Sequence, residues 1–342
     1  MSQCRSNGQG PRVFALALSL TTVVFVLGCS ESQQGTKTDE GTSSGPFKSL
    51  EAVANAPQAF SAPRAGVPLA DGSVAFIATL EGQLSAESSE SGKRIGVLLQ
   101  PPGKGEVSVL YSGDLLVSPL DIALSVDEST LYIADPAAGE DGLGALLTLD
   151  VSGGEPSVAL AGSRPRAVTI SDQGEVYFTG SSDDRAEPGV FLLSGSSASA
   201  VFTGPPLVDP SGIAVKKDGT LLVADTRLFD GQAELGSEAG IVRISEGQAS
   251  IWASGFATGY PAGIALTLDE KTLIISGEGP DRSDSVYLVD TNTPTAPPSV
   301  VTATFSAFQD SSAGLKRARS SNTFIWASLA ADGGTVYRIV AN

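Results

Sequence analysis

The stretch that decides the fold is PSGIAVKKDGTLLVAD, at residues 210–225. It holds two short apolar runs, GIAV and TLLVA, which Lys216-Lys217-Asp218-Gly219 separates. Short apolar runs on either side of an Asp-Gly turn are typical of a β-hairpin. The stretch therefore predicts two antiparallel strands, the first of which begins with a Pro-x-small motif.

The same pattern recurs along the chain. Five prolines each begin a copy and Ser312 takes the equivalent place in a sixth; the prolines are Pro63, Pro119, Pro165, Pro210 and Pro261. The spacings are 56, 46, 45, 51 and 51 residues. In each copy the residue eight places after the start opens the turn; these residues are Asp71, Asp127, Gln173, Asp218, Asp269 and Ser320. A repeat of this length indicates the blades of a β-propeller.

Each period has room for four strands, and in the clearest copy we expect the third and fourth at 240–245 and 249–253. The sequence thus predicts an all-β domain over residues 47–342, a six-bladed β-propeller with four-stranded antiparallel blades. The sixth copy ends after its third strand, at 335–340. We expect residues 48–53 to supply the missing outer strand and close the ring, because an unpaired sheet edge invites aggregation.

The first 46 residues differ in character. Arg5 and Arg12 precede fifteen uncharged residues, 13–27, which is the profile of a signal peptide. The sequence VLGC at 26–29 resembles the lipobox of bacterial lipoproteins. We therefore expect a lipoprotein signal peptide at 1–28, lipidation of Cys29 and a flexible tether at 29–46. The alternatives are an ordinary secretory signal or a short membrane anchor.

A lipidated Cys29 implies an exported protein held by its lipid at a membrane, at the outer membrane, the periplasmic face or the cell surface. The other cysteine, Cys4, lies in the leader, so no disulfide is expected in the mature chain. The chain has no histidine, which excludes Ser-His-Asp catalysis and histidine-bound zinc. Its net charge of −17 argues against nucleic acid as a partner.

The repeats at 119–135, 210–225 and 261–276 resemble NHL repeats and the superfamily of gluconolactonases, senescence marker protein and strictosidine-synthase-like proteins. In the lactonases this resemblance implies a calcium-type metal at the mouth of the central channel. The metal is held by a glutamate of the first blade and by Asn or Asp directly after the proline. The corresponding positions here are Arg64, Leu120, Arg166, Ser211, Ala262 and Ala313.

None of those side chains is a carboxylate or a carboxamide, and a hard dication needs several oxygen ligands. The sequence therefore predicts no cofactor. The alternative is a calcium ion held by some of Asp121, Asp225 and Asp230. No residue is assigned a catalytic role.

Candidate ligand-binding residues at the channel mouth are Arg64, Asp121, Arg166 and Tyr260. The two arginines begin the first and third blades at equivalent positions, and a guanidinium pair can hold a carboxylate or a phosphate by bidentate hydrogen bonds. Alternatively, each arginine pairs with a neighbouring acid such as Asp121 for structural reasons. Trp252 and Trp326 are expected to pack between blades.

Loops that join the second strand of a blade to the third are rich in acids and are expected on the same face as the mouth. They contain Glu81, Glu87, Glu90, Asp135, Glu140, Asp141, Asp183, Asp184, Glu187, Asp225, Asp230, Glu234, Glu238, Glu278, Asp281 and Asp284. Such an acidic collar attracts cations or a basic partner, or it is simply a set of solvated loops.

The function that these patterns favour is a membrane-anchored, non-catalytic binding or scaffold module that uses its loop-rich face. Its ligand is an unidentified protein, glycan or small molecule. The first alternative is a divergent calcium-dependent sugar-lactone lactonase. The second is a structural component of the cell envelope.

Overall fold

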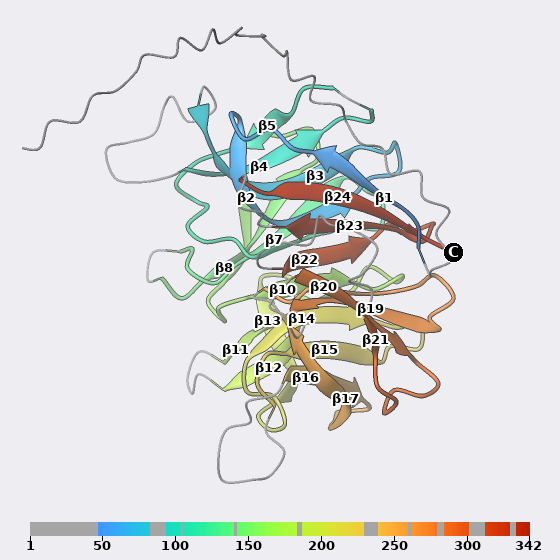
Figure 1. The fold of residues 1–342 in the computed structure, drawn as a ribbon. Helices are drawn as coiled ribbons and strands as arrows, with labels where there is room; N and C mark the ends of the chain where they lie inside the picture. Colours follow the sequence, from blue (N-terminus) through green and yellow to red (C-terminus); the bar gives the residue numbers. More distant parts are fainter. Residues whose placement is uncertain are drawn as a thin grey trace, which may run out of the picture. The chain divides into compact units, whose positions relative to one another are not determined.

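The fold is described from a computed structural model for residues 47–82, 94–103, 105–139, 142–182, 187–228, 239–258, 261–278, 284–300, 312–328 and 333–342. All of these residues belong to one compact unit, Glu40–Asn342. The regular structure in these ranges is β-strand (Figure 1). None of the described segments is a helix of the length and apolarity that crossing a membrane requires.

The strands are short, as the repeats predict. The first twelve are β1 (Phe47–Ala54), β2 (Phe60–Pro68), β3 (Val74–Leu80), β4 (Ile95–Gln100), β5 (Ser108–Tyr111), β6 (Asp121–Leu124), β7 (Thr130–Asp135), β8 (Ala145–Asp150), β9 (Ser157–Ala161), β10 (Ala167–Ile170), β11 (Val176–Ser181) and β12 (Pro188–Ser194). The others are β13 (Ser197–Thr203), β14 (Pro210–Val215), β15 (Leu221–Asp225), β16 (Ala239–Ser245), β17 (Gln248–Thr258), β18 (Ile264–Leu266), β19 (Thr272–Glu278), β20 (Asp284–Asp290), β21 (Ser299–Val300), β22 (Ser312–Arg317), β23 (Thr323–Ser328) and β24 (Thr335–Ala341).

These strands form small antiparallel sheets in a propeller-like arrangement. Four sheets have four strands each, in the orders β2-β3-β4-β5, β6-β7-β8-β9, β10-β11-β12-β13 and β1-β24-β23-β22. The fifth sheet has eight strands, in the order β14-β15-β16-β17-β19-β20-β21, with β18 paired to β19. The sequence predicts separate four-stranded sheets throughout. The eight-stranded sheet differs from that prediction.

The cause of this difference is the length of β17, which has 11 residues. Its last two residues, Ala257 and Thr258, pair with Glu278 and Gly277 at the end of β19. The short strand β18 pairs with the rest of β19. A long outer strand therefore joins what the repeat predicts as the fourth and fifth sheets.

Residues 48–53 are paired, as expected from the missing strand of the last repeat. They lie in β1, which runs antiparallel to β24 with Leu50 opposite Ile339 and Phe47 opposite Ala341. The first and last strands of the described domain thus lie side by side in one sheet (Figure 1).

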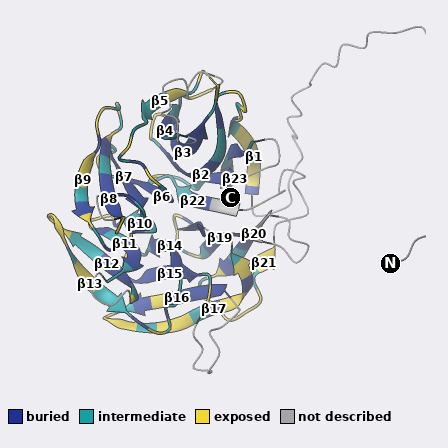
Figure 2. Ribbon diagram, turned by 90° about the vertical axis from the view of Figure 1, so that its left-hand side faces the viewer, coloured by how far each residue is buried: buried dark blue, intermediate teal, exposed yellow. Residues whose placement is uncertain are grey.

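The first strand of each repeat lies near the middle of the domain (Figure 2). In order along the chain, β2, β6, β10, β14, β18 and β22 each contact the next, and β22 contacts β2. A Cβ on Gly263 would lie 2.1 Å from the backbone nitrogen of Leu315, and one on Gly314 would lie 2.7 Å from the Cβ of Ala65. A Cβ on Gly212 would likewise lie 2.3 Å from a backbone oxygen of the next repeat. The glycine of the Pro-x-small motif is therefore required in the fourth, fifth and sixth repeats, where adjacent repeats touch.

Burial falls from the inner strands to the outer ones (Figure 2). Every residue of β3 and of β15 is buried, whereas β13 and β17 each expose several residues. A strand covered on both faces reads as a continuous apolar run, which explains sequences such as VAFIATL and LLVA. The core thus lies between neighbouring sheets.

The two tryptophans pack in this core, as predicted. Trp326 is fully buried and stacks on Tyr337 with ring centroids 5.3 Å apart. Trp252 is partly buried against the apolar cluster of the eight-stranded sheet.

The aspartates eight places after the repeat start cap their hairpin turns. Each accepts a hydrogen bond from the backbone N–H two residues later, at 2.8 to 3.2 Å; the four are Asp71, Asp127, Asp218 and Asp269. Hydrogen bonds hold the pKa of all four carboxyl groups below the usual value, chiefly from serine hydroxyls at Asp71 and Asp127 and from the backbone N–H at Asp218 and Asp269. The repeated Asp is therefore a turn residue.

Candidate functional site

We call the residues that lead into each first strand the leading turn; examples are Ser118-Pro119 and Asp209-Pro210. The buried carboxylate of Asp135, at the end of β7, accepts hydrogen bonds from the N–H groups of Val117 and Ser118 at 2.8 to 3.1 Å. It also accepts from the N–H groups of Ala137 and Ala138, at 3.0 and 3.1 Å. Asp135 therefore ties the leading turn to the loop after the second strand, and burial raises its pKa. It is not a solvated collar residue.

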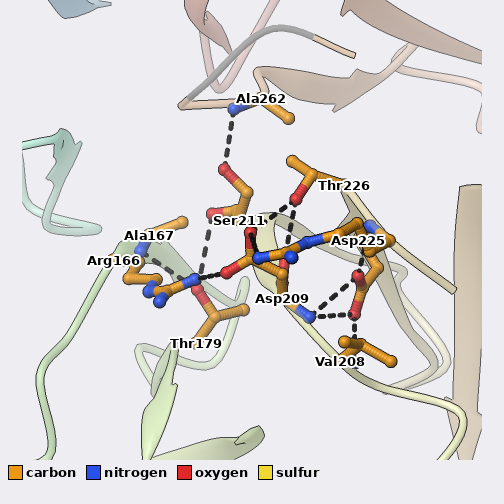
Figure 3. Close-up of polar contacts among 10 residues, drawn as sticks. Arg166, Ala167, Thr179, Val208, Asp209, Ser211, Asp225, Thr226 and Ala262 are labelled. Atoms are coloured by element: carbon orange, nitrogen blue, oxygen red, sulfur yellow. Dashed lines mark hydrogen bonds and ion pairs between the residues drawn. The ribbon is translucent and has the colours of Figure 1, made fainter. Parts of the chain in front are cut away.

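In the fourth repeat, Asp225 ties the leading turn to the loop after the second strand in the same way. Its carboxylate is fully buried and accepts from the N–H groups of Val208, Asp209 and Arg227 at 2.8 to 3.1 Å (Figure 3). Burial raises the pKa of Asp225 to about 6, although these hydrogen bonds oppose the rise. Asp225 is thus occupied by the backbone, and Asp230, its predicted partner at a metal, lies outside the described residues.

Both predicted arginines reach from their own repeat to the leading turn of the next. The Nη1 of Arg64 donates to the Oγ of Ser118 at 3.2 Å and to the carbonyl oxygen of Pro119 at 3.1 Å. The Nη1 of Arg166 donates to Oδ1 of Asp209 (Figure 3). The equivalent positions that the sequence indicated therefore have equivalent roles, which join one repeat to the next.

Asp209 is a site residue that the sequence analysis missed. Besides Arg166, it binds the hydroxyl of Thr226 at 2.7 Å and Nη2 of Arg227 at 3.5 Å. Burial alone would raise the pKa of Asp209, but the hydrogen bonds from Thr226 and Arg166 and the charges of the two arginines lower it. A sequence signal exists, because Asp209 directly precedes the repeat proline, as Ser118 precedes Pro119.

Asp121 pairs with neither arginine. Its Oδ2 lies 2.7 Å from Nζ of Lys316 in β22 and accepts the N–H of Val168 at 2.9 Å. The same ammonium donates to the carbonyl oxygen of Val168 at 2.7 Å. Burial raises the pKa of Asp121, and the charge of Lys316 and these hydrogen bonds oppose the rise. The first strands of three repeats therefore meet at this buried ion pair.

The four predicted ligand-binding residues do not form one site among the described residues. Arg64 binds at the leading turn of the second repeat, Arg166 at that of the fourth, and Asp121 at Lys316. Tyr260 lies outside the described residues, as does Cys29.

The described residues include only part of the predicted acidic collar. Asp135 and Asp225 are buried, and Glu81 accepts a hydrogen bond from the hydroxyl of Ser61 at 2.6 Å. Ten of the sixteen acids lie outside the described residues: Glu87, Glu90, Glu140, Asp141, Asp183, Asp184, Asp230, Glu234, Glu238 and Asp281. Within the described ranges, no group of three or more Cys, Asp or Glu residues is placed to hold a metal ion.

A cavity that the sequence analysis did not anticipate lies at the other end of the first strands, beside the hairpin turns. Its volume is about 130 Å³, and residues of β2, β6, β10, β14, β18 and β22 all line it. We call it the hairpin cavity. Its basic lining residues are Lys216, Lys217, Lys316, Arg317 and Arg319. The sequence signal was the pair of basic runs, KK at 216–217 and KRAR at 316–319, each shortly before the turn position of its repeat.

Comparison with known proteins supports the fold. No protein-family model matches the sequence, and no curated protein matches it. The fold is similar to that of a gluconolactonase from Xanthomonas campestris, with a TM-score of 0.54 and 16% identity over 86% of this chain and 89% of that one. A protein of unknown function from Dyadobacter fermentans gives a TM-score of 0.57 at 12% identity, over 86% and 97% of the two chains. At such identities the likeness concerns the all-β, propeller-like fold alone.

The buried ion pair gives a test of this geometry. We expect Lys316→Met to lower the free energy of unfolding by about 3–5 kcal/mol, because it leaves the carboxylate of Asp121 buried without a counter-charge. The loss should shrink as the pH falls, since a protonated Asp121 carries no charge. Adding Asp121→Asn to this variant should restore part of the stability. Urea unfolding between pH 5 and pH 8 measures these effects.

The matched control is Lys271→Met. The ammonium of Lys271 lies 3.4 Å from Asp269, but both side chains are more than half exposed, so little change is expected. Equal losses for Lys316→Met and Lys271→Met, or additive losses in the double variant, would contradict the ion pair.

Proposed function

We propose that residues 47–342 form a six-bladed β-propeller that acts as an exported binding module rather than as an enzyme. In this interpretation, the eight-stranded sheet is two blades joined where β17 meets β19, and β1 closes the ring. The cycle of contacts among the six first strands supports this blade count, as does the single cavity that all six line.

The observation that carries the binding function is that the acidic groups predicted at the mouth are already bonded to other groups of the chain. Asp135 and Asp225 are bound by backbone N–H groups, Asp121 by Lys316, and Asp209 by Arg166. A general base or a metal ligand needs an oxygen lone pair that faces the substrate or the metal. Here Asp135 and Asp225 bind backbone groups of their own repeats, and Asp209 and Oδ2 of Asp121 join neighbouring repeats. Of the oxygens of these four carboxylates, the buried Oδ1 of Asp121 alone has no hydrogen-bond partner among the described residues. The acid-rich loops, which the sequence predicts on the same face, would bind a protein, a glycan or a small ligand.

The competing function is calcium-dependent hydrolysis of a sugar lactone, which the fold of the Xanthomonas campestris gluconolactonase suggests. A calcium ion takes six to eight oxygen ligands. Of the three candidates, Asp121 and Asp225 already have partners within the chain, and Asp230 lies outside the described residues. The binding module is therefore favoured.

Calcium distinguishes the two functions. We expect the thermal unfolding midpoint of the full-length chain in detergent to be the same in millimolar calcium and in chelator. A metal that bound only the folded state would raise the midpoint. Magnesium at the same concentration controls for general cation effects. A calcium-specific rise that Asp121→Asn removes would favour the lactonase, and hydrolysis of a sugar lactone would then be the next assay.

We also propose that the chain is exported, processed at Cys29 and held at a membrane by lipid on that cysteine. The support is the uncharged stretch 13–27 after Arg5 and Arg12 and the lipobox-like VLGC at 26–29. The tether at 29–46 would then separate the propeller from the membrane surface.

The cysteines allow a controlled test of the anchor. In a bacterial host, wild-type protein should fractionate with membranes, and intact mass spectrometry should show a chain that begins at lipidated Cys29. Cys29→Ser should lose both the lipid and the cleavage, whereas Cys4→Ser should behave like the wild type. Cleavage of Cys29→Ser near residue 28 with release of soluble protein would instead indicate an ordinary secretory signal.

A further inference from the structure

The hairpin cavity is separate from the mouth and differs from it in charge. Five cationic side chains line it, from the fourth and sixth repeats, together with the two carboxylates of Asp172 and Glu270. The whole chain carries a net charge of −17, so this excess of positive charge is opposite to the average of the molecule. A recess lined by charges of one sign concentrates the potential inside it. The cavity therefore attracts anions.

Two of the cations are engaged by the chain itself. Lys316 binds Asp121 and the carbonyl oxygen of Val168. The Nη1 of Arg317 donates to the carbonyl oxygens of its own turn, at 2.6 Å from that of Ala318. Burial lowers the pKa of Arg317, and the neighbouring charge of Arg319 adds to the effect although Asp172 opposes it. These residues shape the inner wall and supply positive charge.

Arg319 is different, because its donors lack good acceptors. Its Nε is buried and has no hydrogen-bond partner among the described residues. Its Nη2 lies 3.4 Å from the carbonyl oxygen of Leu124, and its Nη1 lies 3.9 Å from Oδ1 of Asp172, a largely exposed carboxylate. A guanidinium has five N–H donors and no acceptor, and a buried donor without a partner costs free energy. Because Arg319 lines the cavity and its terminal nitrogens have only these distant partners, an acceptor in the cavity would satisfy donors that the chain leaves weakly bonded.

The neighbouring Lys216 is also loosely held. The Nζ of Lys216 lies 3.8 Å from Oδ2 of Asp218, beyond hydrogen-bonding distance. The exposed Lys217 donates to the carbonyl oxygen of Leu268 at 2.8 Å and lies at the solvent side of the cavity. Since the centre of one water needs about 10–15 Å³ of such space, a cavity of about 130 Å³ has room for a small anion with some water.

We propose that the hairpin cavity binds a small oxyanion, a phosphate or a carboxylate, with Arg319 as its principal ligand and Lys216 as a second. The oxygens of such an anion accept several N–H donors at once, which is the chemistry that Arg319 lacks within the chain. The site lies at the hairpin end of the first strands, so it is independent of any partner at the mouth.

The test is calorimetric titration of the full-length chain in detergent with inorganic phosphate, with sodium chloride holding the ionic strength constant. We expect saturable binding at one site per chain. Titrations with sulfate and with succinate distinguish phosphate-like anions from carboxylates, and saturable binding of any of the three supports an oxyanion site. No saturable binding of any of them would overturn the proposal.

Arg319→Gln should weaken the binding at least tenfold. Arg338→Gln is the matched control, because both arginines have side chains that are 24% exposed. Arg338 also donates to a backbone carbonyl, that of Gly72, and lies 3.7 Å from a carboxylate, that of Glu51. Arg338→Gln should bind like the wild type. Unchanged binding by Arg319→Gln, or equal weakening by the two variants, would refute the assignment.

If Arg319→Gln does not fold, Arg319→Lys provides the same test with the charge retained. It removes the buried Nε–H and the planar fork, so we expect weaker binding of phosphate with an unchanged thermal midpoint in the absence of anion. Wild-type affinity in Arg319→Lys would show that charge alone accounts for binding and would remove Arg319 as a specific ligand.

Discussion

The structure depends on how closely the first strands of adjacent repeats approach one another. At the third residue of the Pro-x-small motif, adjacent repeats come so close that a Cβ on Gly212, Gly263 or Gly314 would clash with the next repeat. The residues at this position are Ala65, Asp121, Ala167, Gly212, Gly263 and Gly314. The exception, Asp121, uses its carboxylate to bind the N–H of Val168 in the next repeat. This contact around the middle buries both faces of the second strands and so creates the core.

The close approach of the first strands also determines which polar groups remain available to bind a ligand. At the leading turns and first strands, Asp121, Asp209 and the two arginines join neighbouring repeats, and Asp135 and Asp225 bind the backbone of their own repeats. At the hairpin end, Arg319 and Lys216 have only distant or partial partners. Within the described residues, the satisfaction of polar groups therefore points to the hairpin cavity rather than to the mouth as a small-ligand site.

Much of the fold could be predicted from the sequence because each copy of the repeat contains the residues that form its turns and strands. The hairpin aspartates, the pairing of residues 48–53 and the packing of Trp326 each follow from a short pattern. Side-chain partners between repeats could not be predicted, since they depend on loop geometry. Asp225 was predicted to be a collar acid or a calcium ligand, yet residues 208 and 209 bring their N–H groups to it. The hairpin cavity was missed because its basic runs, about 100 residues apart, meet only in the folded chain.

Unfolding of a Gly263→Ala variant in urea tests the central claim most directly, with Ala52→Val, at an exposed position of β1, as the control. The added Cβ would lie 2.1 Å from the backbone nitrogen of Leu315, so adjacent first strands would have to separate. We predict that Gly263→Ala loses about 1–3 kcal/mol of unfolding free energy while the control stays close to the wild type. If Gly263→Ala were as stable as the control, the claim that the fold depends on close contact between adjacent first strands would be contradicted.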